Sequence, residues 1–361
     1  MRKITLLILL SITFFGFAQN GAPAAPYYNG FNWTQTGTAL KNSLATITIS
    51  KHTNFLSYTP GVWNACKETD LDPNNTNNVL LIYGWENGTD SDVTNDLSRD
   101  KNSNSGNNGD WNREHVYAKS LGTPALDDGG SSDAGEDAHH LRSSDVQRNN
   151  TRGNLKFAAG SGNSSTVTGG WYPGDEWKGD VARMMMYMYL RYGSQCLPTN
   201  VGVGASVVSD PDMIDLFLTW NAQDPVSLYE DNRNTYHGNT TNNYAQGNRN
   251  PFIDNPYLAT VIWGGPIAQN RWPNIFLGNE IFASANISIY PNPSSNHKIN
   301  IDSTISIDDL QLINLNGQLL LEVKNPVFNN NSYTLDNLPQ GFYFLKLSSN
   351  NQSLIKKVMV N

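Results

Sequence analysis

Apolar and polar positions follow different patterns in the two parts of this chain, before and after about residue 284. Residues 181–192 are apolar on nearly every face and are followed by Gly193, which predicts a buried helix that ends at a glycine. Three pairs, Asp210-Pro211, Asp224-Pro225 and Asn255-Pro256, precede further apolar stretches. Each pair predicts a helix start with a capping side chain and a proline in the first turn. The polar, glycine-containing stretch 92–110 predicts a surface loop.

Beyond residue 284, short alternating stretches replace the helical pattern. They occur at 287–290, 298–301, 310–313 and 342–347, and Asn316-Gly317 between two such runs predicts a hairpin turn. Several short strands separated by turn residues predict a small β-sandwich over residues 284–361. All nine tryptophans and five of the six histidines precede it. We therefore expect an α+β protein with a mainly helical domain at 19–283 and an all-β domain behind it.

The first residues have the features of an export signal. Arg2 and Lys3 are followed by an apolar stretch from Ile4 to Phe17 and by a small residue, Ala18, which predicts a signal peptide at 1–18. An anchoring helix is the alternative, but the apolar run is short and no basic stop follows it. We expect an exported protein without a stable membrane span. Its two cysteines, Cys66 and Cys196, are compatible either with one disulfide or with two free thiols.

The net charge of −8 has the wrong sign for binding nucleic acid by bulk electrostatics. A protein of this charge could still act on nucleic acid if the contact were local, through a metal ion and a few arginines at one phosphate. The candidate chemistry must therefore be found in particular residues.

Two clusters carry that chemistry: Asn112-Arg113-Glu114-His115-Val116, and Asp137-Ala138-His139-His140-Leu141 with Asn149, Arg152 and Asn154 behind it. Hydrolysis of a phosphodiester needs a base, a cation and donors for the phosphate oxygens. A histidine suits the base, and Mg²⁺ accepts one carboxylate and one amide oxygen while keeping most of its waters. Glu114 can supply the carboxylate. If 143–152 is helical, Asn149 supplies the amide, with Arg152 on the adjacent face.

These residues also allow other interpretations. A lone Glu-His pair is commonly a surface or capping feature, and His139 and His140 are compatible with core positions. Together with His115 they could instead form the zinc site of a different hydrolase, although neither an HExxH nor a CxxC pattern accompanies them. A non-catalytic surface binding module is the third alternative.

The two clusters in combination resemble the endonuclease I family of secreted, non-specific nucleases, which carry a ββα-metal (His-Me finger) site. The resemblance extends to stretches 175–183, 224–226 and 246–254, and it covers most of residues 27–264. It implies that His115 is the general base and that Glu114 and Asn149 hold one Mg²⁺, with Mn²⁺ or Ca²⁺ as alternatives. His140, His139 and Asn154 would support the site.

The cation that contacts the phosphate stays open in this resemblance. Some relatives carry an arginine in the insertion after the catalytic histidine, but residues 119–137 contain none here. Arg152 could meet a phosphate or steady the helix, and Arg113 and Arg148 are the other candidates. The family implies a monomer that cuts DNA, RNA or both without sequence preference, since its contacts go to the backbone, and that leaves 5′-phosphate ends.

The tail resembles a second family, the C-terminal sorting domains of cargo of the type IX secretion machinery. The resemblance rests on Ile289-Tyr290-Pro291-Asn292-Pro293, Leu338-Pro339-Gln340-Gly341-Phe342-Tyr343 and Lys356-Lys357-Val358-Met359-Val360. It implies a secreted or cell-surface protein that engages this machinery. An ordinary carbohydrate- or protein-binding sandwich is the alternative, but such a domain would have an aromatic-lined face, which this asparagine-rich tail does not offer.

Overall fold

The computed structural model of the chain describes residues 21–129, 134–276, 287–349 and 352–361. It divides into an N-terminal unit, Met1–Trp272, and a C-terminal unit, Pro273–Asn361. The expected signal peptide at 1–18 and the expected domain boundary at 283/284 both lie outside the described residues. Both helices and sheets are present, and the described residues of the C-terminal unit form strands without helices, in line with the expected α+β class.

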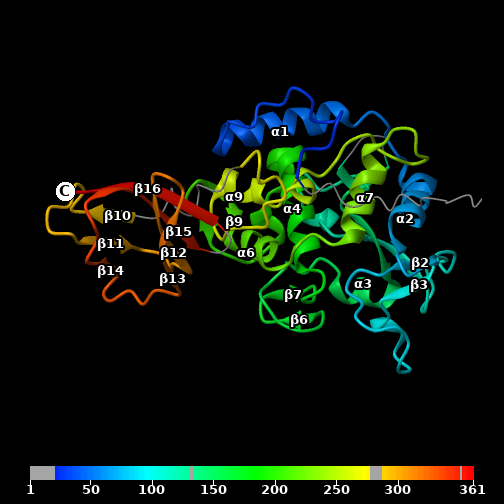
Figure 1. The fold of residues 1–361 in the computed structure, drawn as a ribbon. Helices are drawn as coiled ribbons and strands as arrows, with labels where there is room; N and C mark the ends of the chain where they lie inside the picture. The colour runs from blue at the N-terminus through cyan, green and yellow to red at the C-terminus, as the bar shows by residue number, and fades with distance from the viewer. Residues whose placement is uncertain (1–20, 130–133, 277–286, 350–351) are drawn as a thin grey trace, which may run out of the picture. The chain divides into compact units, whose positions relative to one another are not determined.

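The N-terminal unit is built around one buried helix, α4 (Lys178–Tyr192), against which α1, α5, α6 and α8 pack (Figure 1). Twelve of its fifteen residues are buried, and it ends at Gly193 with φ 55°, as the sequence predicts. The other helices are α1 (Gly37–Lys51), α2 (Trp63–Thr69), α3 (Val146–Arg152), α5 (Pro198–Val201), α6 (Asp215–Gln223), α7 (Leu228–Gly238), α8 (Pro251–Asp254) and α9 (Tyr257–Trp263). Short helical turns are η1 (Tyr58–Val62), η2 (Val93–Asn95), η3 (Lys119–Leu121), η4 (Ala134–Glu136) and η5 (Gly193–Cys196).

Two of the three predicted helix starts are wrong. Asp210-Pro211 lies in strand β9 (Asp210–Ile214), because the Asp210 carboxylate binds Lys41 and Trp263 instead of a helix terminus. Asp224 accepts from the Gly179 amide of α4, and α7 is capped by Ser227. Asn255-Pro256 does precede a helix, α9, and the Asn255 side chain accepts from Tyr257 N.

Four small sets of strands complete the N-terminal unit: β1 (Leu71–Asp72), β2 (Asn75–Leu80) and β3 (Ser98–Asp100); β4 (Trp111–His115) with β5 (Leu141–Asp145); β6 (Ser165–Val167) with β7 (Gly170–Tyr172); and β8 (Ser206–Val207) with β9. The stretch 92–110 is not wholly a loop, since it contains η2 and β3. A cluster that includes Trp111, Leu141 and Cys66 packs beneath β4 and β5.

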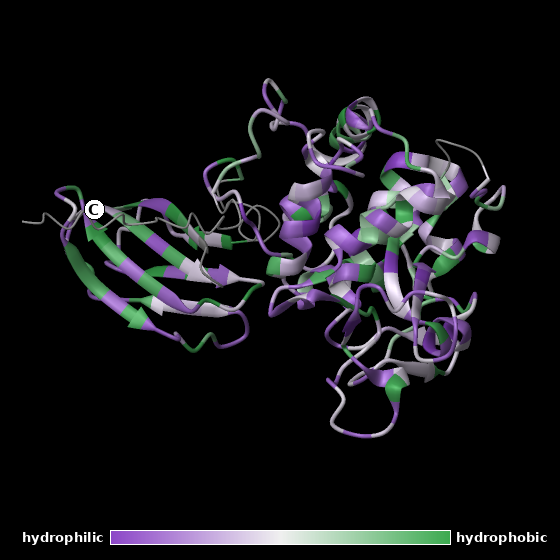
Figure 2. Cartoon of the chain, turned by 90° about the vertical axis from the view of Figure 1, so that its right-hand side faces the viewer, coloured by the Kyte–Doolittle hydropathy of each residue, from purple (hydrophilic) through white to green (hydrophobic). Residues whose placement is uncertain are grey.

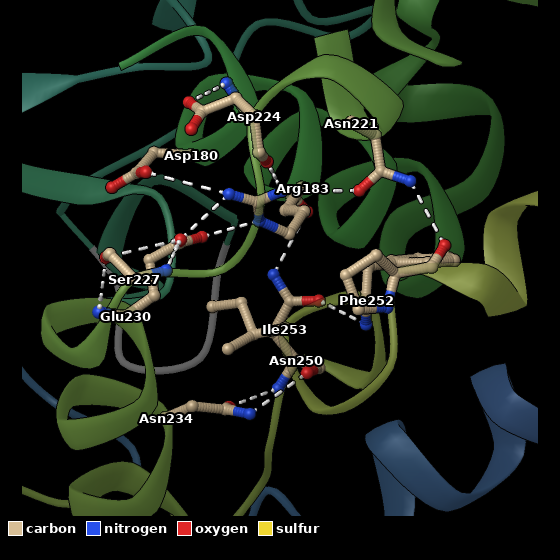
Figure 3. Close-up of polar contacts among 12 residues, drawn as sticks. Asp180, Arg183, Asn221, Asp224, Ser227, Glu230, Asn234, Asn250, Phe252 and Ile253 are labelled. Carbon is tan, nitrogen blue, oxygen red and sulfur yellow. Dashed lines mark hydrogen bonds and ion pairs between the residues drawn. The ribbon is translucent and has the colours of Figure 1, made fainter. Parts of the chain in front are cut away.

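Charged side chains occupy much of this interior. Arg183 of α4 has no exposed side-chain surface and makes a two-pronged ion pair with Glu230, at 2.6 and 2.8 Å. It also donates to the Asp224 carbonyl, while Asn250 donates to the Arg183 carbonyl (Figure 3). These contacts join α4 to α7 and to the start of α8.

The C-terminal unit contains two antiparallel sheets around an apolar core. One has the order β10 (Ile287–Tyr290), β11 (Ile299–Ser303), β14 (Ser332–Leu335); the other has the order β13 (Leu319–Lys324), β12 (Asp309–Asn314), β15 (Gly341–Ser349), β16 (Gln352–Val360). The strands alternate apolar and polar residues (Figure 2), and the apolar ones from both sheets share one cluster. The predicted hairpin at Asn316-Gly317 joins β12 and β13, with Gly317 at φ 80°.

Cys66 and Cys196 are both buried, and they form no disulfide with each other. Burial raises the pKa of the Cys66 thiol well above its usual value. Within the described residues, no helix combines the length and the apolar character needed to cross a membrane.

Candidate active site

The two sequence clusters form a strand–strand–helix arrangement. β4 and β5 pair antiparallel, with Glu114 opposite Arg142 and His115 opposite Leu141, and α3 follows β5 directly and packs on both strands. The expected helix at 143–152 begins at Val146 instead, because Asp145 ends β5 and its carboxylate caps the amides of residues 147 and 148. Asn149 and Arg152 nevertheless lie on α3 as expected.

Alternation along β4 divides its side chains between two environments. Asn112 and Glu114 contact α3, through Asn149 and Arg152 respectively. Arg113 and His115 instead lie against Tyr58 of η1. The candidate base and the candidate carboxylate ligand are thus neighbours in sequence at the end of one strand, with side chains in different surroundings.

Glu114 is 2% exposed and is held at one oxygen. The Tyr83 hydroxyl donates to Oε1 at 2.9 Å, and Arg152 Nη1 lies 3.0 Å from the same atom. Oε2 accepts no hydrogen bond from the described residues. Burial raises the pKa of Glu114 to about 7 despite the opposing effects of Arg152 and Tyr83, so a further cation beside Oε2 would stabilise the ionised carboxylate.

The Asn149 amide is oriented by a neighbouring amide on β4. Its Nδ2 donates to Asn112 Oδ1 at 2.7 Å and lies 3.5 Å from the Arg113 carbonyl oxygen. In this orientation Nδ2 donates to β4, and Oδ1 accepts no hydrogen bond from the described residues. The site therefore offers one carboxylate oxygen and one amide oxygen, which are the hard donors that Mg²⁺ prefers.

His115 is held in one tautomer. Its Nε2 lies 2.9 Å from the Gly135 carbonyl oxygen, which can only accept, so Nε2 carries the proton and Nδ1 is left as an acceptor. Tyr58 stacks on the ring at a centroid distance of 5.4 Å. Burial, with a smaller contribution from His140, lowers the pKa of His115 to about 3, so the imidazole is neutral at ordinary pH.

The turn that carries Gly135 is fixed from two sides, and nothing in the sequence singles it out as part of the site. A Cβ at Gly135 would overlap the carbonyl oxygen of Asp127, so the close approach requires glycine. Two residues later, the Asp137 carboxylate accepts from Tyr187 at 2.7 Å and Tyr192 at 2.9 Å, both near the end of α4. The carbonyl that orients His115 is therefore held indirectly by the central helix.

The predicted arginines are all engaged with the protein. Arg152 is fully buried and, besides Glu114, donates to the carbonyls of His115 and Val116, which favours the structural role over contact with phosphate. Arg113 donates to the Tyr58 carbonyl and stacks on the Tyr58 ring, 3.5 Å from its centroid. Arg148 donates to the Thr94 carbonyl at 2.7 Å.

The supporting residues separate into two locations. His140 Nε2 bonds the Ala134 carbonyl at 2.7 Å, and its ring lies 5.6 Å from that of His115. His139 faces the other way, bonded to the Asn248 carbonyl and packed on His237. Asn154 donates to Ser120 of η3 at 3.3 Å.

The zinc alternative finds no support in this geometry. Each of His115, His139 and His140 uses its Nε2 on a backbone carbonyl, and His139 does not lie with the other two. Across the described ranges, no group of three or more His, Cys, Asp or Glu residues has the arrangement of a metal site. A set of one carboxylate and one amide is smaller than such a group and suits an ion that keeps its waters.

Comparison with known proteins identifies the families of both parts of the chain. The model of the family described as Endonuclease I matches residues 36–257, and that of the secretion system C-terminal sorting domain matches residues 288–361. The extracellular ribonuclease of Bacillus subtilis (strain 168) is 45% identical over 258 residues, which cover 67% of this chain and 82% of that protein. The extracellular ribonuclease of Bacillus amyloliquefaciens is 45% identical over 239 residues, covering 63% and 75%.

The chain is accordingly a secreted nuclease, with a catalytic unit followed by a sorting domain of the type IX secretion pathway. It belongs to the Endonuclease I family. Both resemblances inferred from sequence motifs are confirmed by these matches.

Proposed function

We propose that this nuclease is an endonuclease that hydrolyses the phosphodiester bonds of RNA and DNA, with His115 as general base and one Mg²⁺ held by Glu114 and Asn149. The main support is a pair of oxygens that accept no hydrogen bond from the described residues, Glu114 Oε2 and Asn149 Oδ1, together with His115, which lies on the same strand as Glu114 and whose tautomer is fixed. When bound, Mg²⁺ would neutralise charge that develops on the phosphate and on the departing oxygen.

His115 would take a proton from water at Nδ1 while Nε2 keeps its bond to Gly135. The oxygen of that water then forms a bond to phosphorus, and the bond to the 3′-oxygen breaks, leaving a 5′-phosphate.

Arg152 acts in this proposal as a positioning residue. Its guanidinium joins Glu114 Oε1 to the two carbonyls at the end of β4, so it fixes both the ligand and the strand that carries His115. Because water, and not a ribose 2′-hydroxyl, is the nucleophile, both sugars should be accepted. The relatives named as ribonucleases support RNA as one substrate.

The test is digestion of supercoiled plasmid and of a labelled RNA by the full chain in Mg²⁺, in EDTA, and after Mg²⁺ is restored. His115→Ala should lower the rate by roughly 100- to 10,000-fold. Asn149→Ala should raise the Mg²⁺ concentration needed for cleavage and weaken Mn²⁺ binding measured by electron paramagnetic resonance. Exposed Asn243 provides the matched control, Asn243→Ala. Undiminished cleavage in EDTA, or by His115→Ala, would contradict the proposal.

A further inference from the structure

None of the residues assigned to the proposed mechanism brings a positive side chain to the scissile phosphate. The three arginines closest to it in sequence all donate to backbone carbonyls: Arg152 to residues 115 and 116, Arg113 to residue 58, and Arg148 to residue 94. If such a guanidinium left to meet a phosphate, it would leave a carbonyl without its donor, which carries a penalty where the carbonyl is buried. Arg113 is held further by stacking on Tyr58 and Trp63.

Lys119 differs from these arginines in the way it is held. Its ammonium lies 2.6 Å from Asp128 Oδ2, and both side chains reach solvent, with 38% and 27% of their surface exposed. An ion pair of this exposure contributes little to stability, so a competing anion can replace the carboxylate. Among the residues that the structure describes, the Lys119 side chain donates to no backbone carbonyl that such an exchange would leave unpaired.

The backbone beneath Lys119 is fixed close to the candidate base. Lys119 begins η3, four residues after His115 on the same connection, and its carbonyl accepts from Leu126 N at 3.0 Å. The next residue, Ser120, accepts from Asn154 beyond the end of α3. The supporting role expected for Asn154 is thus explained, because it ties the segment that carries Lys119 to the segment that follows the site's helix.

Both members of the ion pair act electrostatically on the imidazole. Lys119 lowers the pKa of His115, and Asp128 raises it. Asp128 also acts on the pKa of Tyr58 and of Arg113, which lie on the same side of β4 as His115. Contact geometry agrees, since a Cβ at Gly135 would lie 3.2 Å from the amide nitrogen of Asp128, and the Gly135 carbonyl bonds His115 Nε2. The ion pair therefore lies close to the turn that orients the proposed base.

We infer that Lys119 is a catalytic residue that binds a non-bridging oxygen of the scissile phosphate, exchanging Asp128 for the substrate. This inference rests on the proposed nuclease mechanism and supplies its missing protein cation. Lys119 forms no covalent bond and passes no proton; it contributes positive charge where negative charge grows in the transition state. Asp128 holds the ammonium in place until the phosphate arrives, and it weakens the binding of substrate by competing for it.

The experiment compares Lys119→Ala, Lys119→Arg and Asp128→Asn in the full chain with Mg²⁺, using plasmid and a labelled RNA. Lys119→Ala should lower kcat/KM by about 100-fold with an unchanged Tm. Lys119→Arg should restore part of this loss, since the charge is kept and the geometry altered. Lys178→Ala serves as control, because Lys178, the first residue of α4, forms a similar ion pair with Asp175, which precedes that helix.

Binding to an oligonucleotide, measured by fluorescence anisotropy in the inactive His115→Ala background, separates phosphate contact from a structural role. Lys119→Ala should weaken affinity and reduce the slope of log affinity against log salt by about one, whereas Asp128→Asn should strengthen affinity. If Lys119→Ala kept the wild-type kcat/KM and salt slope while His115→Ala was inactive, the role of Lys119 would be overturned. The proposed nuclease mechanism would be unaffected by that result. Absence of His115-dependent cleavage would overturn the mechanism itself.

Discussion

The two units of this protein fill their interiors with different chemistry. The core of the C-terminal unit is a cluster of aliphatic residues and one tyrosine contributed by both of its sheets. The N-terminal unit buries whole ion pairs, among them Arg183 with Glu230 and Arg152 with Glu114. The difference indicates that apolar packing dominates the interior of the sorting domain, whereas the catalytic unit adds buried charges, and one of these, Arg152, contacts both Glu114 and the backbone of His115.

Breaking one interior ion pair should have the largest effect. Arg183→Leu leaves Glu230 buried without its partner, and we expect a loss of about 3–5 kcal/mol in the free energy of unfolding. Urea denaturation followed by tryptophan fluorescence measures it, because every tryptophan belongs to the N-terminal unit. The matched change in the C-terminal unit, Lys324→Leu, removes ion pairs to Asp309 and Glu322 whose lysine is 62% exposed, and it should leave the free energy of unfolding almost unchanged. Equal losses of stability in Arg183→Leu and Lys324→Leu would contradict the proposed difference between the two units.

An apolar truncation in the C-terminal unit should rank second. Leu345 of β15 is fully buried, so Leu345→Ala should cost about 2–5 kcal/mol through lost burial and the cavity that remains. Hydrogen exchange resolved by mass spectrometry measures the change in β12 and β15. Leu319→Ala on β13, where the side chain is 47% exposed, is the control. Nuclease activity and the tryptophan-detected transition should not change; a parallel loss of both would show that the units do not unfold independently.

Acidification should lower the free energy of unfolding of the N-terminal unit, by an amount that grows gradually as the pH falls. Desolvation lowers the pKa of its five histidines, to about 4 for His52 and His140, to about 3 for His115 and His139, and well below the usual value for His237. The unfolded chain therefore binds more protons than the folded one between about pH 4 and 6.5, and stability falls as the pH falls through this window. Each histidine that stays neutral in the folded state lowers the free energy of unfolding by about 1.4 kcal/mol for each pH unit of acidification below its unfolded pKa.

Buried carboxyls act in the opposite direction in the same window. Burial raises the pKa of Glu114 to about 7 and that of Asp224 to about 6, so the folded state holds protons there that the unfolded state has released. Burial also raises the pKa of Asp180 well above its usual value, and that of Asp96, Glu176 and Asp231 less strongly. The five histidines outnumber the three carboxyls with large shifts, Glu114, Asp224 and Asp180, so the net effect should keep its sign. Urea midpoints from pH 7 to pH 4.5, followed by tryptophan fluorescence, give the measurement. A midpoint that rises on acidification would show that the carboxyls dominate.

The sequence predicts best where one local pattern decides the outcome. Alternation predicted strands at the positions of β10, β11, β12 and β15 and the Asn316-Gly317 hairpin, and continuous apolar character predicted α4 with its glycine end. Two helix starts were predicted wrongly because Asp210 and Asp224 cap nothing locally and bind partners from elsewhere in the chain. The helix-capping propensity of one residue cannot reveal that its side chain will bind a partner many residues away in the sequence.

The same limit applies to the candidate site. The motifs identified Glu114, His115 and Asn149, and the structure brings the strand and helix that carry them together. Tyr83 and Gly135, which orient Glu114 and His115, come from loops with no motif that marks them. The close approach of Asp127 to Gly135 could be found only once the chain was folded.

The two buried cysteines have a consequence for the conditions in which the fold persists. Cys66 and Cys196 form no disulfide with each other, and both are shielded from solvent. No disulfide stabilises the native state, so a reducing agent such as dithiothreitol should leave its urea midpoint unchanged.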